Sequence, residues 1–287
     1  MKKKITPYIL LVPQLILGAI FIIGLGTGII QSLGVIPAFG LTEPTLKYYK
    51  EILTRPDILQ SLKYSLYIAF VSAFFATLIG TILCAILVNL KQVKGKVMRV
   101  VQIPIIVPHV IVALFVINIL SQNGILARIG AQLGLLTDQQ QFPLLLYDGH
   151  GIGVILAYLW KEIPFIVYFV IALMANISES LGEAATNLGA NQIQVFWKVT
   201  LPLCMNTVLS GFLIVFVFAL GAYELPFILG ATLPRALPVL SYIEYSKPDL
   251  LARPYAMAIN GLIIAISCLV AAIYYILLHR NTKKLAG

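Results

Sequence analysis

The stretch Glu183-Ala184-Ala185-Thr186-Asn187-Leu188-Gly189-Ala190, followed by Val199-Thr200-Leu201-Pro202, decides how this chain is interpreted. It lies between two strongly apolar segments in a chain of 287 residues that is 60% hydrophobic and only 11% charged. A soluble domain carries roughly 25% charged residues. The segment 177–205, called here the polar island, is therefore a polar loop in a chain whose other segments are mostly apolar enough to lie in a membrane. Such a loop suggests a role in docking a partner.

Six apolar runs are long enough to cross a membrane as helices, since a span takes about 20 residues. The alternating pattern of a membrane barrel is absent from the sequence, so helices are the spanning elements. We therefore predict an all-α polytopic membrane protein with one membrane domain over residues 1–287. The predicted spans are 8–30, 62–89, 101–120, 152–176, 206–230 and 255–278, and the loop 177–205 joins the fourth to the fifth.

The charges are divided unequally between the two sides of this topology. Six spans place both termini on one side, where 11 cations face 2 acids, whereas the other side carries 8 cations and 7 acids. The positive-inside rule predicts that the termini and the 177–205 loop are cytoplasmic. Topology and contact with anionic head groups account for the net charge of +9, so nucleic-acid binding is not expected. The inner cations are Lys2, Lys3, Lys4, Lys91, Lys94, Lys96, Arg99, Lys198, Arg280, Lys283 and Lys284.

The sequence offers no metal site, cofactor site or catalytic set. The cysteines and histidines are few and scattered, which indicates packing roles. No Gly-x-x-x-x-Gly-Lys-Ser/Thr motif occurs, so the chain has no P-loop of its own. We expect no cofactor to be bound by this chain. The residues concerned are Cys84, Cys204, Cys268, His109, His150 and His279.

The polar island predicts two short helices joined at Gly189. Ser180-x-x-Glu183 and Asn191-x-x-Gln194 have the spacing of capping boxes, and Gly189 can end the first helix in a left-handed conformation. Pro202 is expected to set the turn into the fifth span. A hairpin that merely connects two spans and a hairpin that docks a partner are equally favoured by these residues.

The argument for docking is an apolar surface of mixed side-chain size on this loop. Small residues let another protein approach closely, and aromatic residues can fill its pocket. The residues of this surface are Ala184, Ala185, Ala190, Phe196 and Trp197.

The island resembles the EAA signature of the membrane permease subunits of binding-protein-dependent ABC importers. The matching residues are Glu183-Ala184-Ala185, Gly189, Val199 and Leu201-Pro202, with Val199 where the family often has Ile. The resemblance extends to Trp160-Lys161-Glu162-Ile163-Pro164-Phe165 and, more loosely, across all six spans. It implies the type I ABC importer permease fold, with coupling helices in the 177–205 loop.

The resemblance implies that this loop sits in a groove of an ATPase subunit, with Glu183 as the anchoring acid and Gly189 as the bend. The full coupling set is Glu183, Ala184, Ala185, Gly189, Ala190, Phe196 and Pro202. The implied partners are two ABC ATPase subunits that carry ATP and magnesium, a second permease (homologous or identical), an extracytoplasmic substrate-binding protein and the lipid bilayer. The implied location is the bacterial plasma (inner) membrane.

The resemblance also suggests a branch of the superfamily. Leu188-Gly189-Ala190 looks like the polyamine, iron, thiamine and phosphonate importers, whereas the sugar branch more often has Asp-Gly-Ala. Gly221-Ala222-Tyr223-Glu224-Leu225-Pro226-Phe227, Leu237-Pro238-Val239-Leu240 and Pro248-Asp249-Leu250 also look like that branch. The resemblance to this branch implies that the transported substrate is a small polar solute.

Three charged residues fall well inside predicted spans, away from their ends. Lys161 and Glu162 lie about nine residues into the fourth span, which is roughly 13 Å deep, and Glu224 lies in the fifth beside Tyr223. Intramembrane charges normally face protein or water. Either Lys161, Glu162, Glu224 and Tyr223 line the translocation pathway, or the charges have a structural role. That role is an ion pair of Lys161 with Glu162 or Glu224, or a contact to a second permease subunit.

Two further features complete the expectations. Prolines 104, 108, 164 and 226 are expected to kink or unwind their helices. On the predicted outer side, Ile125, Leu126, Ile129 and Leu133 form a helical stripe that can lie along the membrane surface. The outer loops 31–60 and 121–151 can alternatively form a lid or dock a soluble protein outside the membrane.

Two other function classes compete with the importer subunit. An ion-coupled secondary transporter needs broken helices in two related halves, and no convincing internal repeat is present. An intramembrane enzyme needs a catalytic constellation at depth, which Lys161, Glu162 and Glu224 do not make. We therefore expect a transport subunit and not an enzyme.

Overall fold

The computed structural model describes residues 2–285, with side chains described for residues 10–276. The secondary structure of the described residues is helical, apart from a single bridge between Ile36 and Leu41. Six helical stretches in it are long and apolar enough to cross a membrane. They are Leu10–Ser32, Pro56–Asn89, His109–Gln132, Ile152–Asn187, Gln192–Gly221 and Leu250–Ile276. The predicted all-α fold with six candidate spans is confirmed.

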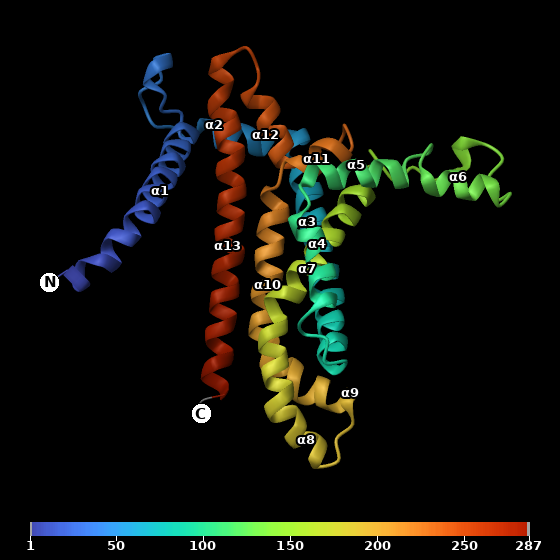
Figure 1. Cartoon of the computed structure of the whole chain (residues 1–287). Coiled ribbons are helices and arrows are strands. Elements are labelled where there is room, and N and C mark those ends of the chain that lie inside the picture. The colour runs from blue at the N-terminus through green and yellow to red at the C-terminus, as the bar shows by residue number, and fades with distance from the viewer. Residues whose placement is uncertain (1, 286–287) are drawn as a thin grey trace. The chain divides into compact units, whose positions relative to one another are not determined.

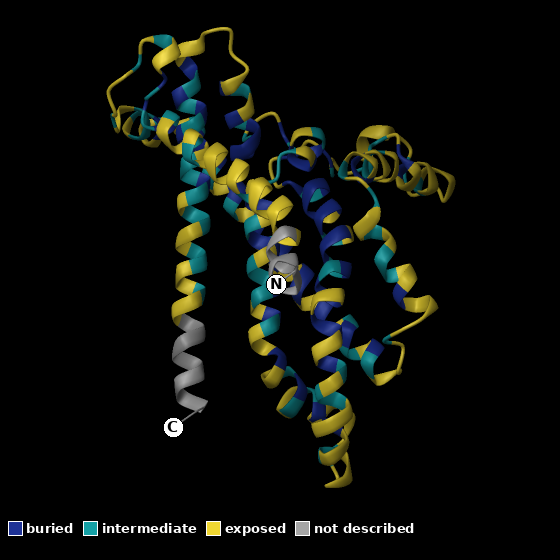
Figure 2. Ribbon diagram, turned by 60° about the vertical axis from the view of Figure 1, so that its left-hand side comes forward, coloured by how far each residue is buried: buried dark blue, intermediate teal, exposed yellow. Residues whose placement is uncertain are grey.

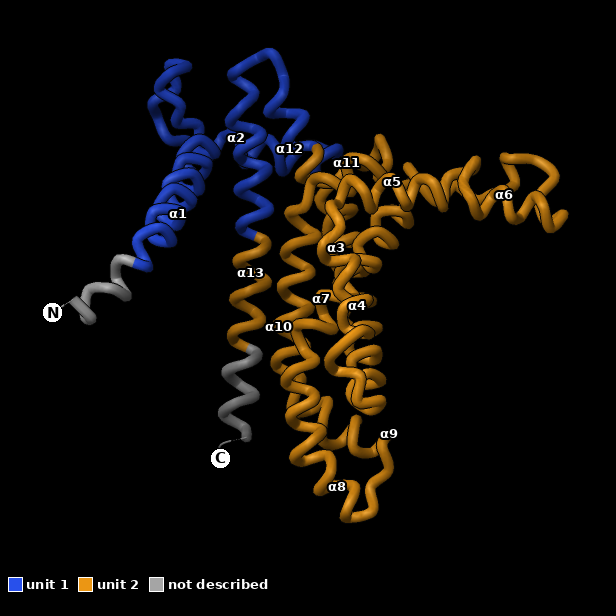
Figure 3. Tube along the Cα trace, viewed as in Figure 1, with its two compact units in different colours: residues 1–59, 240–265 blue, residues 60–239, 266–287 orange. Residues whose placement is uncertain are grey.

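The chain divides into two compact units (Figure 3). Unit 1 comprises residues 1–59 and 240–265, and unit 2 comprises residues 60–239 and 266–287. Unit 1 contains α1 (Lys2–Ser32), a short 3-10 helix (Pro37–Phe39) and α2 (Lys47–Thr54), with most of α12 (Leu237–Tyr245), a 3-10 turn (Leu250–Ala252) and the first part of α13 (Arg253–Leu285).

Unit 2 contains the remaining helices (Figure 1). They are most of α3 (Pro56–Asn89), then α4 (Lys96–Ile106), α5 (His109–Leu120), α6 (Ile125–Gln132), a 3-10 turn (Gln139–Gln141), α7 (Ile152–Ile177), α8 (Glu183–Asn187), α9 (Gln192–Val195), α10 (Leu201–Gly221), α11 (Glu224–Leu229) and the last part of α13. Two π-helical turns, Ser178–Gly182 and Phe196–Thr200, join α7 to α8 and α9 to α10.

A network of charged side chains holds unit 1 together. Glu244 is only 3% exposed and lies between Arg55 (Nη1 to Oε1, 2.9 Å) and Lys247 (Nζ to Oε2, 2.7 Å). Arg55 also donates from Nη2 to Asp57 at 2.6 Å. These hydrogen bonds, that to Asp57 foremost and that to Glu244 next, raise the pKa of Arg55 above its usual value. The network ties the end of α2 to the turn between α12 and α13.

The core of unit 2 forms around α7. Ile166 is fully buried there and faces a glycine on each of two neighbouring helices. A Cβ on Gly80 of α3 would lie 2.8 Å from Ile166 Cβ, and one on Gly211 of α10 would lie 2.9 Å from Ile166 Cδ1. Small residues of this kind let membrane helices approach closely. The buried residues in Figure 2 accordingly concentrate where these helices meet.

Three predicted spans need correction. The third, predicted as 101–120, is broken between α4 and α5 at Val107–Pro108. The fourth does not end at 176, because helical structure continues to Asn187. The fifth, predicted as 206–230, begins as a continuous helix at Gln192, ends at Gly221 and is followed by the separate α11.

We predict that Glu244→Ala destabilises the protein more than Asp57→Asn. Removing the Glu244 carboxylate leaves Arg55 and Lys247 without this acceptor, and the Arg55 side chain is only about a third exposed. We expect the free energy of unfolding to fall by about 1–3 kcal/mol. Asp57 is nearly half exposed, so its loss should cost about 1 kcal/mol or less. Thermal unfolding of the purified variants measures both, and equal losses would contradict this assignment. Because the pKa of Arg55 is raised in the folded protein, its contribution to stability is fully present below the pKa of an unfolded arginine and disappears only in strong alkali.

Candidate functional site

The polar island forms one end of unit 2 as a helical hairpin, residues 178–200, called here the hairpin (Figure 1). Its first arm is a direct extension of α7, because helical structure runs from Ile152 to Asn187. The predicted capping box at Ser180 and Glu183 is therefore wrong. A helix that is already running has no unpaired first-turn amides at these residues, and the Ser180 hydroxyl instead donates to the Asn176 carbonyl at 2.9 Å.

Gly189 ends the first arm as predicted. Its φ is +92°, in the left-handed region that favours glycine. The Ala190 N–H donates to Ala185 O at 3.1 Å, and the Gly189 N–H donates to Thr186 O at 2.9 Å. These two bonds make a Schellman turn, which satisfies carbonyls left free at the helix end.

The second arm begins with the predicted capping box. Gln194 N–H donates to Asn191 Oδ1 at 2.9 Å, and Asn191 N–H donates to Gln194 Oε1 at 3.0 Å. Pro202, however, sets no turn, since the helix passes through it from Gln192 to Gly221. It is the second residue of α10 and directly follows the π-helical turn, where the Leu201 N–H reaches back to Phe196 O. The N–H that Pro202 lacks therefore falls where the backbone hydrogen bonds change from the π-helical to the α-helical pattern.

The tip of the hairpin exposes large apolar side chains. Leu188 is 90% exposed, Ile193 71% and Trp197 61%, whereas Phe196 is half-buried with its ring centroid 5.3 Å from that of Trp197. Of the predicted coupling residues, Glu183, Ala184 and Pro202 are exposed, and Ala185 and Ala190 are half-buried. Exposed apolar groups of this kind mark contacts with another protein or with a membrane. Leu188 and Ile193 belong to this surface but are missing from the predicted coupling set.

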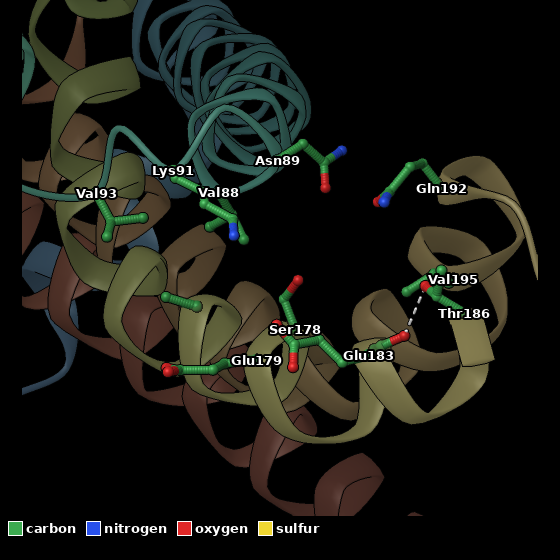
Figure 4. A pocket seen from close by; sticks show the side chains of 12 residues that line it. Val88, Asn89, Lys91, Val93, Ser178, Glu179, Glu183, Thr186, Gln192 and Val195 are labelled. Atoms are coloured by element: carbon green, nitrogen blue, oxygen red, sulfur yellow. Dashed lines mark hydrogen bonds between the residues drawn. The ribbon is translucent and has the colours of Figure 1, made fainter.

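A cavity of about 300 Å³ lies between the hairpin and the end of α3 (Figure 4). Asn89 at the end of α3 and Gln192 at the start of α9 face each other across its opening. Glu183 and Lys91 also line it. The sequence did not connect the loop after α3 with the hairpin, because residues about a hundred positions apart carry no local signal of contact.

A second polar region surrounds the break between α4 and α5. Pro108 has no N–H for the Pro104 carbonyl, and it disfavours a helical conformation at Val107. Val107 accordingly leaves the helix, with ψ of 128°. Lys161 Nζ of α7, only 7% exposed, donates to Val107 O at 2.6 Å. The lysine thus satisfies a carbonyl at the broken end of α4.

The break between α10 and α11 has the same cause. Pro226 cannot donate to the carbonyl of Ala222, four residues earlier, and Ala222 is extended with ψ of 135°. Glu224 is then the first residue of α11 and is more than half exposed. The prediction that it lies within a continuous fifth span is wrong. Glu224 Oε2 lies 3.5 Å from Nδ1 of His109, the first residue of α5.

The two breaks therefore bring together Lys161, His109 and Glu224. Among the described side chains, Lys161 makes no salt bridge to Glu162 or Glu224, so the ion pair that the sequence left open as one alternative is not formed. Glu162 is buried on α7, and Tyr223 stacks on Phe227 with ring centroids 4.9 Å apart. Sequence reasoning missed His109; its position directly after Pro108 was the available signal.

Comparison with known proteins identifies the family. Residues 76–284 match the model of the "Binding-protein-dependent transport system inner membrane component" family, so the chain belongs to that family. It is 24% identical over 249 residues to the sulfate transport system permease protein CysT of Salmonella typhimurium, covering 86% of each chain. It is 24% identical over 240 residues to the putrescine transport system permease protein PotI of Escherichia coli, covering 83% of this chain and 79% of PotI.

A solved structure has the same fold. A bacterial ABC transporter involved in the import of the acidic polysaccharide alginate superposes with a TM-score of 0.76 at 20% identity, covering 97% of this chain and 96% of the other. The protein is a multi-pass membrane permease subunit of an ABC importer. Family membership selects this function over an ion-coupled secondary transporter and over an enzyme.

We predict that the left-handed turn at Gly189 tolerates asparagine but not valine. Asparagine enters this region readily, whereas a β-branched residue there is a true outlier. Gly189→Val should lower ATP-dependent uptake by about tenfold or more, the equivalent of about 1.4 kcal/mol, and Gly189→Asn should stay within a fewfold of wild type. No side-chain clash confounds the comparison, because a Cβ at Gly189 meets nothing within 4 Å. Equal uptake by the two variants would show that the turn conformation is unimportant.

Proposed function

We propose that the hairpin is the joint between this permease and an ABC ATPase subunit. The observation that carries the proposal is the exposed tip formed by Leu188, Ile193 and Trp197. In the assembly that we propose, two ATPase subunits bind ATP and magnesium, a second permease of homologous or identical sequence completes the pathway, and an extracytoplasmic binding protein delivers the solute. One similar solved structure, described as a bacterial alginate ABC transporter, is in complex with an alginate-bound periplasmic protein.

The helix that carries the hairpin supplies the mechanical route. Helical structure runs without interruption from Asn187 at the hairpin back to Ile152. Lys161 lies on the same helix and holds Val107 at the α4–α5 break. When the ATPase pair closes on ATP, the hairpin and α7 move together as a rigid body, and the two helix breaks change their separation. The free energy of ATP hydrolysis is thus transmitted to the pathway mechanically, and this chain carries out no covalent chemistry.

The orientation follows from the charge distribution. Both termini and the hairpin are on the cytoplasmic side, where cations outnumber acids. The terminal lysines and Arg280 that contribute to this count lie outside the residues whose side chains are described. The membrane is the bacterial inner membrane.

The solute is a small polar molecule of the polyamine, iron, phosphonate and thiamine range. The two relatives named above are described as sulfate and putrescine permeases, so similar chains serve both an anion and a cation. Glu224 and Tyr223 at the α10–α11 break, with Lys161 and Glu162 on α7, are the residues that we assign to the pathway. Both signs of charge are present in this set.

We expect Glu183→Lys and Gly189→Asp to uncouple transport while the protein still inserts. Charge reversal at Glu183 removes the anchoring acid, and aspartate at Gly189 places a charge beside the apolar tip. Uptake and recovery of the cognate ATPase in a pull-down should both fall by about tenfold or more, the equivalent of about 1.4 kcal/mol.

Glu43→Lys is the matched control, since Glu43 is an exposed acid outside the hairpin. It should leave both measurements near wild type. Wild-type uptake together with wild-type ATPase recovery in the two hairpin variants would refute the proposed joint.

We expect Glu224→Gln to lower uptake and substrate-stimulated ATPase activity by about tenfold, the equivalent of about 1.4 kcal/mol. The change keeps the side-chain size but removes the charge beside His109. Uptake of sulfate and of putrescine, compared in the same membranes, shows whether the loss depends on the sign of the solute. Glu43→Gln, at an exposed acid away from the helix breaks, is the control. Unchanged activity in Glu224→Gln would remove this residue from the pathway.

A further inference from the structure

Residues 121–142 form a small lobe that extends away from the helices of unit 2 (Figures 1 and 2). The lobe, called here the α6 lobe, is closed by its own hydrogen bonds. Gln122 Nε2 donates to Phe142 O at 3.1 Å, which joins its two ends. Thr137 and Gln141 exchange two further bonds, of 2.8 and 2.9 Å. The lobe therefore holds its shape with few contacts to the rest of the unit.

One face of α6 is apolar and exposed. Ile125, Leu126, Ile129 and Leu133 are each between 44% and 69% exposed. At 100° per residue they fall within one arc of about 100°. The predicted stripe is thus present, and within this chain it faces outward.

The opposite face of α6 is turned toward the polar part of the lobe. Ala127 is buried there, and Ala131 lies one turn further along the same side. Both line a cavity of about 390 Å³ together with Thr137, Asp138 and Gln139. Apolar and polar groups are therefore separated on the two sides of one short helix.

The apolar face continues the surface of a candidate span. In α5, directly before the lobe, Val110, Leu114, Phe115 and Ile119 are exposed. No Asp, Glu, Lys or Arg occurs between Arg99 and Arg128. Arg128 stands at the edge of the apolar arc, where its Nε donates to Asn123 O at 3.0 Å.

We propose that the α6 lobe binds the lipid surface of the leaflet opposite the hairpin, with α6 lying at the boundary between head groups and acyl chains. Short amphipathic helices occupy this depth, and a cation at the edge of the apolar face suits the phosphate level. The proposal rests on the membrane location of the family and not on the proposed joint with the ATPase.

The size of the face favours lipid over a second copy of the chain. A helix of eight residues is about 12 Å long and about 10 Å wide, a footprint on the order of 120 Å². A stable protein interface takes about 800 Å² from each partner. Lipid needs no such minimum, because the face only extends the apolar surface of α5.

Attachment to lipid has a consequence for the helix breaks. The α6 lobe fixes the far end of α5, and the first residue of α5 is His109, beside Glu224. The lobe thus anchors the helix that begins at the α4–α5 break.

Spin labels on the two faces of α6 test the proposal. Ile129→Cys and the matched Ala131→Cys are made with Cys268→Ser, because Cys268 is exposed while Cys84 and Cys204 are buried. The full chain with its partner subunits is reconstituted in phosphatidylethanolamine and phosphatidylglycerol vesicles. Collisions with oxygen, which concentrates in lipid, are compared with collisions with a water-soluble nickel complex.

We expect the Ile129 label to collide preferentially with oxygen and the Ala131 label with nickel, with ratios that differ by about tenfold. Preference for nickel at Ile129 places the face in water and overturns the proposal. An Ile129 label that neither reagent reaches places the face against protein and overturns it equally. ATPase recovery in the hairpin variants does not enter this result, so the two proposals fail separately.

Discussion

The continuous helix from Ile152 to Asn187 is the constraint on which the rest of unit 2 depends. These 36 residues span about 54 Å as a helix, against about 30 Å for the bilayer core. A helix of this length can cross the bilayer core and still extend beyond it to α8. One rigid element therefore carries the buried Lys161 and leads directly to the exposed apolar tip. A stop signal anywhere between them would separate the hairpin mechanically from the helix breaks.

Glycines and prolines determine where the helices of unit 2 pack tightly and where they end. Where α7 must stay fixed against its neighbours, Gly80 and Gly211 allow the backbones of α3 and α10 to approach Ile166 closely. Where the neighbouring helices must end, Pro108 and Pro226 remove a donor each. Pro164 lies inside α7 without ending it, since packing on two sides holds that helix. The same residue type thus has opposite effects, and tertiary packing decides which.

The two capping patterns show how far local sequence predicts this structure. Asn191-x-x-Gln194 forms its box because the Schellman turn at Gly189 has already ended the preceding helix. Ser180-x-x-Glu183 has equivalent spacing but forms none, because no Gly or Pro lies between Pro164 and Gly182 to stop α7. That signal was present in the sequence and outweighs the cap. The number and order of the spans were predictable from hydropathy, whereas their ends required knowledge of which prolines break a helix.

The partner of Lys161 shows why the polar region between the breaks was beyond sequence reasoning. A buried ammonium needs an acceptor, and the adjacent Glu162 was the obvious choice from sequence. Neighbours on a helix point about 100° apart, however, so Lys161 and Glu162 cannot both reach the same place. The acceptor is the Val107 carbonyl, 54 residues away, and it is free only because Pro108 breaks the helix there. A lysine that caps a broken helix end makes the conformation of that break depend on the position of α7. In the mechanism that we propose, this one hydrogen bond links the hairpin to the pathway.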